Sequence, residues 1–126
     1  MQQSILIVDD NIDIAKVIQR SLQENDYDIH CFYDSLRALE YFKMNSYNTA
    51  AIIADIRIPG MSGLELASRA KKINPKVKVF FVTAFDVDLI EPTIDSLDFD
   101  IIEIFQKPLS GEEISNTVIK HIESKM

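Results

Sequence analysis

The 126-residue sequence predicts an α/β fold, in which helices cover both faces of a parallel sheet. Two observations support this class. Five short apolar or β-branched runs are spread along the chain, and the segments between them carry apolar residues at helical spacing. Because each strand is followed by a helix that returns the chain to the same end of the sheet, successive strands run parallel. The length fits a single domain, residues 1–126, without an output domain.

The predicted strands are short, and the first and third contain apolar residues without alternation. Such runs are typical of parallel strands that are buried on both faces. The five predicted strands are Ile5–Val8, Ile29–Phe32, Ala50–Ala54, Val77–Val82 and Ile101–Phe105. In an open sheet of this kind, ligands bind at the carboxyl ends of the strands, so chemistry is expected there.

The first three predicted helices have apolar residues three or four positions apart. These residues are Ile14, Ile18 and Leu22 in the first helix, Leu36, Leu39 and Phe42 in the second, and Leu64, Ala67, Ala70 and Ile73 in the third. The fourth helix, within Val87–Leu97, contains Pro92, which must either begin the helix or break it. We therefore expect a short or late helix, with a mobile segment at Asp86–Glu91.

The last predicted helix has the clearest start signal. Ser110 is a typical capping residue, and Glu113 stands three positions later, where it completes a capping box. Leu109 and Ile114 occupy the two positions of a hydrophobic staple. The buried stripe of this helix is predicted to consist of Ile114, Val118 and Ile122.

The composition restricts the classes of function. Thirteen basic and twenty acidic residues give a net charge of −7, and there is no basic stripe, which argues against direct binding to nucleic acid or anionic membrane. The apolar run Ile5–Val8 is too short for a signal peptide or a membrane span, so we expect a cytoplasmic protein. Cys31 is the single cysteine, which excludes an internal disulfide and a cysteine-based metal cluster.

Polar residues stand at the ends of four predicted strands. Asp9 and Asp10 follow the first strand, Asp55 follows the third, Thr83 ends the fourth, and Lys107 comes just after the fifth. On a parallel sheet these side chains converge at one edge. Close carboxylates repel one another, and a hard divalent cation relieves that conflict. An all-oxygen ligand set favours Mg²⁺, with Mn²⁺ as a substitute.

These residues suit phosphoryl transfer, which needs positioning and charge neutralisation more than covalent help from the protein. Lys107 supplies an ammonium, Thr83 supplies a hydroxyl donor, and a carboxylate can act as the nucleophile that forms an acyl phosphate. Each residue also has a simpler interpretation. Asp9 and Asp10 could begin a helix, Asp55 could belong to an ordinary turn, and Thr83 and Lys107 could be a capping residue and a solvated lysine.

Four stretches, in order and each at a strand end, are Ile5–Asn11, Asp55–Leu66, Thr83–Ala84 and Lys107–Pro108. They resemble the motifs of response regulator receiver domains, which belong to the chemotaxis-regulator-like superfamily of two-component signalling. The resemblance covers essentially the whole chain. It implies a flavodoxin-like, doubly wound (βα)5 fold with a five-stranded parallel sheet in the order 2-1-3-4-5.

The resemblance also implies roles for the acidic residues. Asp55 would accept the phosphoryl group. Asp10 would bind Mg²⁺ directly, and Asp9 would bind it mostly through water. The backbone carbonyl of Arg57 would be a further metal ligand.

The remaining roles concern the phosphoryl oxygens and the partners. Thr83 and Lys107 would hold those oxygens, Thr83 would shift toward them on activation, and the small Ala84 would keep the pocket open. A sensor histidine kinase or a histidine phosphotransfer protein would be the donor, and an unknown downstream protein would be the target. The fourth helix, last strand and last helix would form the signalling face and the face of a homodimer. The chain would not be an enzyme, since it would catalyse only its own phosphorylation and dephosphorylation.

The sequence departs from the family at the signalling step. Many receivers have an aromatic switch residue three positions before the lysine, but Ile104 stands there, with Phe105 next to it. Either Ile104 fills the space that Thr83 vacates, or Phe105 points the other way and takes no part. Arg57 and Phe85 occupy positions that influence the lifetime of the phosphate in this family.

Three other functions compete with this one. An interaction module with the same fold would act without phosphorylation. An aspartyl-nucleophile phosphohydrolase would need a second acid two residues after the first, where Asn11 stands beyond Asp9. A flavin-binding electron carrier would need a loop rich in hydroxyls and glycine after the first strand, where Asp9 and Asp10 have the wrong charge for its phosphate.

Overall fold

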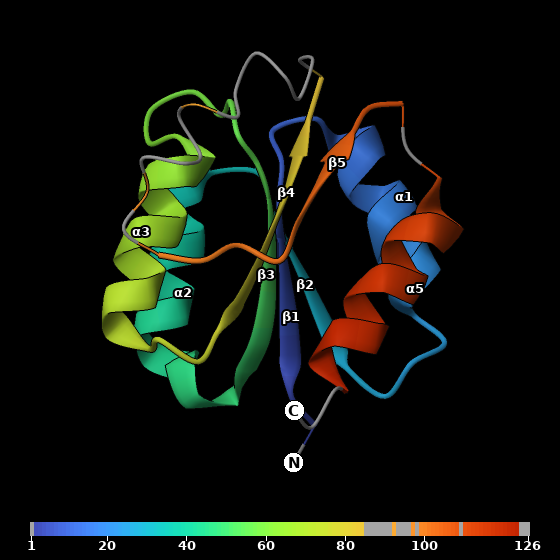
Figure 1. Ribbon diagram of the computed structural model, residues 1–126, viewed down its shortest axis with the longest axis horizontal. Helices are drawn as coiled ribbons and strands as arrows, with labels where there is room; N and C mark the ends of the chain where they lie inside the picture. The colour runs from blue at the N-terminus through green and yellow to red at the C-terminus, as the bar shows by residue number, and fades with distance from the viewer. Residues whose placement is uncertain (1, 85–91, 93–96, 98, 109, 124–126) are drawn as a thin grey trace.

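The computed structural model describes residues 2–84, 92, 97, 99–108 and 110–123. Its centre is a sheet of five parallel strands in the order β2-β1-β3-β4-β5, which confirms the predicted fold class and strand order (Figure 1). The strands are β1 (Ser4–Val8), β2 (Asp28–Phe32), β3 (Thr49–Asp55), β4 (Lys78–Thr83) and β5 (Glu103–Gln106). Because the strands are parallel, their carboxyl ends all lie at one edge of the sheet, at the top of Figure 1.

The described helices cover both faces of the sheet, with α2 and α3 on one face and α1 and α5 on the other (Figure 1). They are α1 (Ile12–Leu22), α2 (Ser35–Asn45), α3 (Gly63–Ile73) and α5 (Gly111–Ile122), and a 3-10 turn, η1 (Ser46–Asn48), follows α2. The helix expected within residues 87–97 lies almost entirely outside the described residues, and so does the segment 86–91 that we expected to be mobile.

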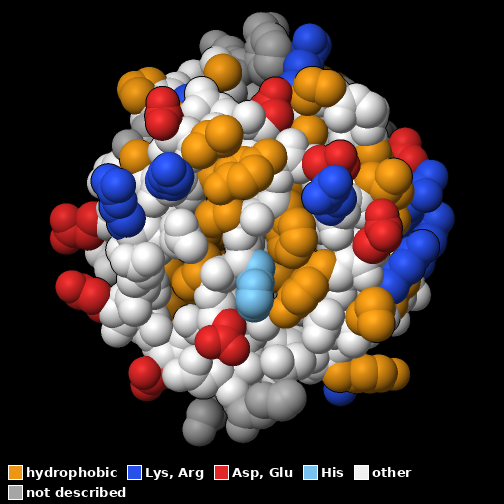
Figure 2. Space-filling view, turned by 180° about the vertical axis from the view of Figure 1, so that it is seen from behind, with side chains coloured by type: hydrophobic (Ala, Val, Ile, Leu, Met, Phe, Trp, Pro, Cys, Tyr) orange, Lys and Arg blue, Asp and Glu red, His pale blue; other side chains and the backbone are white. Residues whose placement is uncertain are grey.

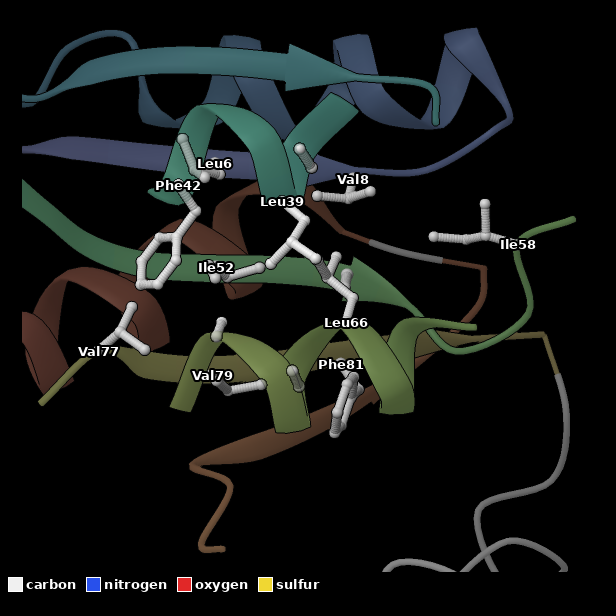
Figure 3. Close-up of a cluster of buried hydrophobic side chains, with 14 of the residues drawn as sticks. Leu6, Val8, Leu39, Phe42, Ile52, Ile58, Leu66, Val77, Val79 and Phe81 are labelled. Carbon is white, nitrogen blue, oxygen red and sulfur yellow. The ribbon is translucent and has the colours of Figure 1, made fainter. Parts of the chain in front are cut away.

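The sheet divides the core into two clusters, because successive side chains of a strand point to opposite faces. Figure 3 shows the cluster between the sheet and α2 and α3, where Leu39, Phe42 and Leu66 pack on Ile52 and Phe81. The second cluster lies under α1 and α5, and its members include Ile5, Ile7, Ile18, Phe80, Phe105, Ile114 and Val118. Burial of β1 and β3 on both faces explains why their sequences are apolar without alternation.

Side-chain caps fix where the helices begin. Asn11 Oδ1 accepts hydrogen bonds from the backbone N–H groups of Asp13 and Ile14, which starts α1 at Ile12, three residues after Asp9. Ser110 Oγ accepts the N–H of Glu113, so the predicted cap of α5 is confirmed. Leu109, the other half of the predicted staple, lies outside the described residues.

Some details differ from the sequence-based expectations. β5 begins at Glu103 rather than at residue 101, and Ile101 and Ile102 pack against the two core clusters before the strand begins. Leu36 falls at the predicted helical spacing of α2, yet it is 55% exposed. The buried face of α2 instead uses Ala38 together with the predicted Leu39 and Phe42, and in α5 the end of the stripe, Ile122, is only partly buried.

Candidate functional site

The predicted site residues lie at the carboxyl edge of the sheet. Asp9 directly follows β1, Asp55 is the last residue of β3, Thr83 is the last residue of β4, and Lys107 directly follows β5. Asp9, Asp55 and Thr83 are buried, and Lys107 is partly buried. Four segments that are far apart in the sequence therefore deliver one acidic, lysine-containing site.

Both carboxylate oxygens of Asp55 are held by the protein. Oδ1 accepts the backbone N–H of Arg57 at 3.2 Å, and Oδ2 accepts a hydrogen bond from Lys107 Nζ at 2.9 Å. Next to this carboxylate, the backbone N–H of Ile56 donates to the carbonyl of Val82, which ties the end of β3 to β4. Asp55 is 7% exposed, so its carboxylate is fixed in orientation while its edge still meets solvent.

Asp9 is a fully buried carboxylate beside Asp55. Its Oδ1 accepts the backbone N–H of Asn11 at 2.9 Å, and its Oδ2 lies 3.2 Å from Lys107 Nζ. Within the described part of the chain, Oδ2 accepts no well-aligned hydrogen bond. Burial raises the pKa of Asp9 above the ordinary 3.8, and the negative charge of Asp55 raises it as well. The hydrogen bond from the N–H of Asn11 and the charge of Lys107 lower this pKa, but they do not outweigh burial.

Lys107 is the counter-charge of both buried carboxylates. Burial by itself lowers the pKa of this lysine, but the hydrogen bond to Asp55 and the negative charges of Asp9 and Asp55 outweigh burial. The net pKa of Lys107 is therefore above its ordinary value, and the ammonium is charged at neutral pH. The backbone N–H of Lys107 donates to the carbonyl of Thr83 at 2.6 Å, and the peptide bond between Lys107 and Pro108 is cis.

The three aspartates fit a hard divalent cation. One carboxylate oxygen from each of Asp9, Asp10 and Asp55 lies within 4.8 Å of the other two. Asp9 and Asp55 are buried, whereas Asp10 is exposed at the mouth of the site. Three carboxylates and one ammonium leave an excess of negative charge, and Asp9 Oδ2 accepts no well-aligned hydrogen bond from the described residues, although Lys107 Nζ lies 3.2 Å away. An all-oxygen set with this charge matches Mg²⁺.

Two glycines shape the loop that follows Asp55. Gly60 has a φ of +86°, in the left-handed region, which explains the Pro59-Gly60 turn. Gly63 begins α3, and a Cβ atom there would collide with the backbone carbonyl of Asp55. Sequence reasoning assigned Gly63 no role, although its place in the Asp55–Leu66 motif was a usable signal. Its missing side chain lets α3 start directly against the residue that carries the carboxylate.

The residues predicted to relay the signal lie on different faces of the sheet. Ile104 pairs with Phe81 across the strands and packs in the cluster on the α2 and α3 side. Phe105 is buried on the α1 and α5 side, where its ring stacks on Phe80 with centroids 6.4 Å apart. Thr83 follows Phe81 by two positions, so strand alternation puts Ile104 and Thr83 on one face and Phe105 on the other.

Two surface hollows lie at opposite ends of the strands. One, of about 500 Å³, lies beside the aspartates and is lined by Asp10, Ile56, Arg57, Ile58, Pro59 and Ser62. Another, of about 560 Å³, lies where the strands begin, next to Gln3, Tyr47 and Lys78. None of the predicted site residues lines the second hollow, so we assign it no part in this chemistry. Phe85, which we predicted to influence the lifetime of the phosphate, lies outside the described residues.

None of the described helices combines the length and the apolar character that crossing a bilayer requires. The fold and the site together define a doubly wound α/β domain with acidic residues and a lysine at the strand ends. The model of the response regulator receiver domain family matches residues 5–119, and the chain therefore belongs to this family. Members of the family act in two-component signalling, in general as signalling modules, and bind Mg²⁺ through acidic residues.

The chain is also similar to individual members over most of their length. Sporulation initiation phosphotransferase F of Bacillus subtilis (strain 168) is 29% identical over 126 residues, which cover 99% of this chain and 98% of that protein. The response regulator receiver protein CpdR of Brucella abortus (strain 2308) is 28% identical over 116 residues, 92% of this chain and 93% of that protein. The crystal structure of a receiver domain protein from Clostridium thermocellum has a TM-score of 0.82 at 24% identity, over 95% of this chain and 94% of that one.

Proposed function

We propose that Asp55 accepts a phosphoryl group in an Mg²⁺-dependent reaction, and that the resulting acyl phosphate is the signal this domain carries. The observation that carries the proposal is the Asp55 carboxylate at the end of β3, held 2.9 Å from Lys107 Nζ and grouped with Asp9 and Asp10. In the transfer, an oxygen of Asp55 forms a bond to phosphorus while the bond between phosphorus and the donor atom breaks.

The fixed orientation of Asp55 supports its role as the nucleophile. The N–H of Arg57 and the ammonium of Lys107 hold the two oxygens, so the carboxylate does not have to be ordered at the moment of reaction. Asp9 is fully buried, whereas Asp55 is 7% exposed. Asp55 is therefore the buried carboxylate that an incoming phosphoryl group reaches best.

The acidic residues would hold the metal. Asp9, Asp10 and Asp55, together with the backbone carbonyl of Arg57, are the proposed ligand set. When bound, Mg²⁺ supplies positive charge that neutralises the phosphoryl oxygens. Lys107 and the hydroxyl of Thr83 contribute the remaining positive charge and a donor from the β4 and β5 side of the site.

Ile104, rather than Phe105, is the proposed link between the site and the signalling face. Ile104 shares a face of the sheet with Thr83, whereas Phe105 is stacked on Phe80 on the opposite face. A movement of Thr83 toward a phosphoryl group opens space on its own face of the sheet. The branched side chain of Ile104 is placed to fill that space. The rest of the proposed signalling and dimer face, the fourth helix, lies outside the described residues.

The proposed phosphoryl donor is a histidine kinase or a histidine phosphotransfer protein, as is general for this family. The similarity to a protein named a phosphotransferase, along nearly its entire length, favours a carrier that passes the group onward. Sustained hydrolysis of an added phosphomonoester would instead support the phosphohydrolase alternative. A chain that signals identically with Asn at position 55 would support the interaction module.

Chemical trapping locates the phosphoryl group directly. Borohydride reduces an aspartyl phosphate to homoserine, which changes the mass of one peptide only. After incubation with Mg²⁺ and acetyl phosphate, we expect homoserine at position 55 and unmodified aspartate at positions 9 and 10. Asp10→Asn serves as the control that keeps Asp55 but weakens the metal site. Homoserine at position 9 or 10 in the natural protein would overturn the assignment of Asp55.

A further inference from the structure

β2 is one of the two outer strands of the sheet, and no described strand covers its far side. It pairs with β1 and with no other strand among the described residues. Figure 2, which views the molecule from behind relative to Figure 1, shows hydrophobic side chains gathered in a band along this face. Four residues of β2, Ile29 to Phe32, are partly exposed, so the strand is not sealed by the helices on either side.

The backbone of β2 has hydrogen-bonding groups aimed outward. Asp28 donates its N–H to Gln3, and Phe32 accepts the N–H of Asp9 at its carbonyl, so both residues face β1. Because neighbouring residues of a strand direct their N–H and C=O groups to opposite sides, Ile29 and Cys31 direct theirs to the open side. An outward-facing pair two residues apart is the spacing that an antiparallel partner strand needs.

The interior of this edge carries little of the usual protection against pairing. Exposed edge strands of monomeric proteins commonly carry charged residues, proline or a bulge, whereas β2, Asp-Ile-His-Cys-Phe, contains no lysine or proline and has its one acidic residue, Asp28, at its first position. Large apolar side chains flank the carboxyl end of the strand, where Tyr33 and Leu36 are exposed. A strand with outward-facing backbone groups and exposed apolar side chains at its carboxyl end suits β-augmentation.

We propose that β2 pairs with the β2 strand of a second copy of this chain, antiparallel and about a two-fold axis at His30. In this register Ile29 exchanges backbone hydrogen bonds with the partner's Cys31, and His30 faces the partner's His30 as a non-hydrogen-bonded pair. It is the register that uses both outward-facing residues of the strand in each copy. The surface lies on the opposite edge of the sheet from β5, so it is distinct from the proposed signalling face.

Charge complementarity points to a second copy as the partner. The two-fold axis is normal to the sheet, so the α2 sides of both copies lie on the same face of the joined sheet. In this register Asp28 comes opposite the partner's Phe32. In each copy Tyr41 contacts Phe32, with ring centroids 5.4 Å apart, and lies beside His30, with its hydroxyl 3.2 Å from Nε2. Arg37 lies one helical turn before Tyr41, toward the carboxyl end of β2.

The partner's Arg37 therefore comes close to Asp28, and the symmetry creates this pair twice. Both residues are exposed, and neither has an ion-pair partner within the part of the chain that the structure describes. The same edge thus carries an acid at one end and a base at the other, which is the pattern that an antiparallel self-association requires.

Disulfide trapping tests the register. In a non-hydrogen-bonded antiparallel pair the Cα atoms are about 4.5 Å apart, which a disulfide can span. We expect the variant His30→Cys with Cys31→Ser to form an intermolecular disulfide under mild oxidation. Ile73→Cys with Cys31→Ser is the matched control, because Ile73 is exposed at the end of α3, which packs on β3 and α2 rather than on β2. Cross-linking that is no faster at position 30 than at position 73 would overturn the proposed register.

Charge reversal tests the interface without touching the strand core. In sedimentation of the whole chain from micromolar to millimolar concentration, Asp28→Arg and Arg37→Asp should each weaken the dimer about tenfold, because the axis counts each change twice. The double variant should restore the dimer, and unphosphorylated Asp55→Asn should dimerise like the natural protein. A natural protein that stays monomeric at all concentrations, or single variants that dimerise normally, would contradict the proposal.

Discussion

At the scale of single residues, Lys107 is the centre of the electrostatics of the site. One ammonium lies 2.9 Å from Asp55 and 3.2 Å from Asp9, so it serves two buried carboxylates at once. The side chain of Lys107 is itself only 16% exposed, which limits screening of these contacts by water. Removing the lysine would leave two buried negative charges without a cation, and that is far more costly than losing a surface ion pair.

We therefore expect Lys107→Met to lower the free energy of unfolding by about 3 kcal/mol in the absence of divalent cations. Urea denaturation of the natural protein and the variant measures this difference. Lys78→Met, at a partly exposed position at the start of β4, is the control for loss of a lysine in general and should change stability little. An equal effect of the two substitutions would show that Lys107 is not the counter-charge of the buried pair.

Asp9 has the opposite effect on stability. Burial raises its pKa, so the folded state binds this proton more tightly than the unfolded chain does. The stabilisation from that proton is complete below the ordinary pKa of 3.8 and is lost as the pH rises through the raised value. At neutral pH the buried charge is therefore a cost to the natural protein when no metal is bound.

We expect Asp9→Asn to raise the unfolding temperature at neutral pH without metal, by the equivalent of roughly 1 kcal/mol, while weakening Mg²⁺ binding. The gain should shrink as the pH falls toward 3.8, where the natural carboxyl is protonated. Thermal unfolding across this pH range measures both effects. A variant that is less stable at every pH would mean that Asp9 contributes more through Asn11 and Lys107 than its burial costs.

At the scale of secondary structure elements, the junction between β3 and α3 determines how the site is built. α3 begins at Gly63, whose N–H donates to the carbonyl of Ile56, and its missing side chain leaves room for the Asp55 carbonyl. Any side chain at this position would force the end of β3 and the start of α3 apart. The nucleophile is therefore positioned by backbone packing as well as by its own hydrogen bonds.

We expect Gly63→Ala to lower stability by about 2–3 kcal/mol and to reduce phosphorylation of Asp55 strongly. Gly60→Ala is the matched control: its positive φ makes alanine unfavourable by about 1 kcal/mol, but no atom lies close enough to collide. Urea denaturation and phosphoryl labelling of both variants separate the two effects. Normal labelling of a folded Gly63→Ala protein would show that this packing does not position Asp55.

The elements also show what the sequence can predict. The strand order followed from the resemblance to receiver domains. The convergence of Asp9, Asp55 and Lys107 also followed from the alternation of strands and helices, because the carboxyl ends of parallel strands lie at one edge of the sheet. The exposure of Leu36 and the late start of β5 could not be predicted, since apolar spacing does not say which side chains the neighbouring elements reach. Among the described residues Asp9 Oδ2 accepts no well-aligned hydrogen bond, and this depends on distances of a few ångströms that no sequence pattern encodes.

At the scale of the whole molecule, metal binding should couple the site to global stability. A ligand that binds only the folded state adds about 1.4 kcal/mol when its free concentration is roughly ten times its Kd. We expect Mg²⁺ to raise the unfolding temperature of the natural protein in this way. Asp10→Asn should abolish most of the gain without changing the metal-free stability much, because Asp10 is exposed. Equal gains in both proteins would place the metal elsewhere.

The molecule separates its proposed activities in space. The acidic site lies at the carboxyl edge of the sheet, and the open side of β2 lies along one flank. Self-association through β2 would therefore leave Asp55 accessible to a phosphoryl donor. The two proposals can fail independently, since one depends on the chemistry of a carboxylate and the other on the pairing of a strand.

Phosphoryl acceptance by Asp55 is tested most directly by the intact mass of the protein after incubation with acetyl phosphate, with and without Mg²⁺, beside Asp55→Asn. The chain contains no tryptophan, so mass is a more direct readout than intrinsic fluorescence. We expect a single phosphoryl adduct that requires Mg²⁺ and is absent from the variant. An adduct that persists in Asp55→Asn would contradict the choice of carboxylate. No adduct on the natural protein, under conditions that label another receiver domain, would contradict phosphoryl acceptance itself.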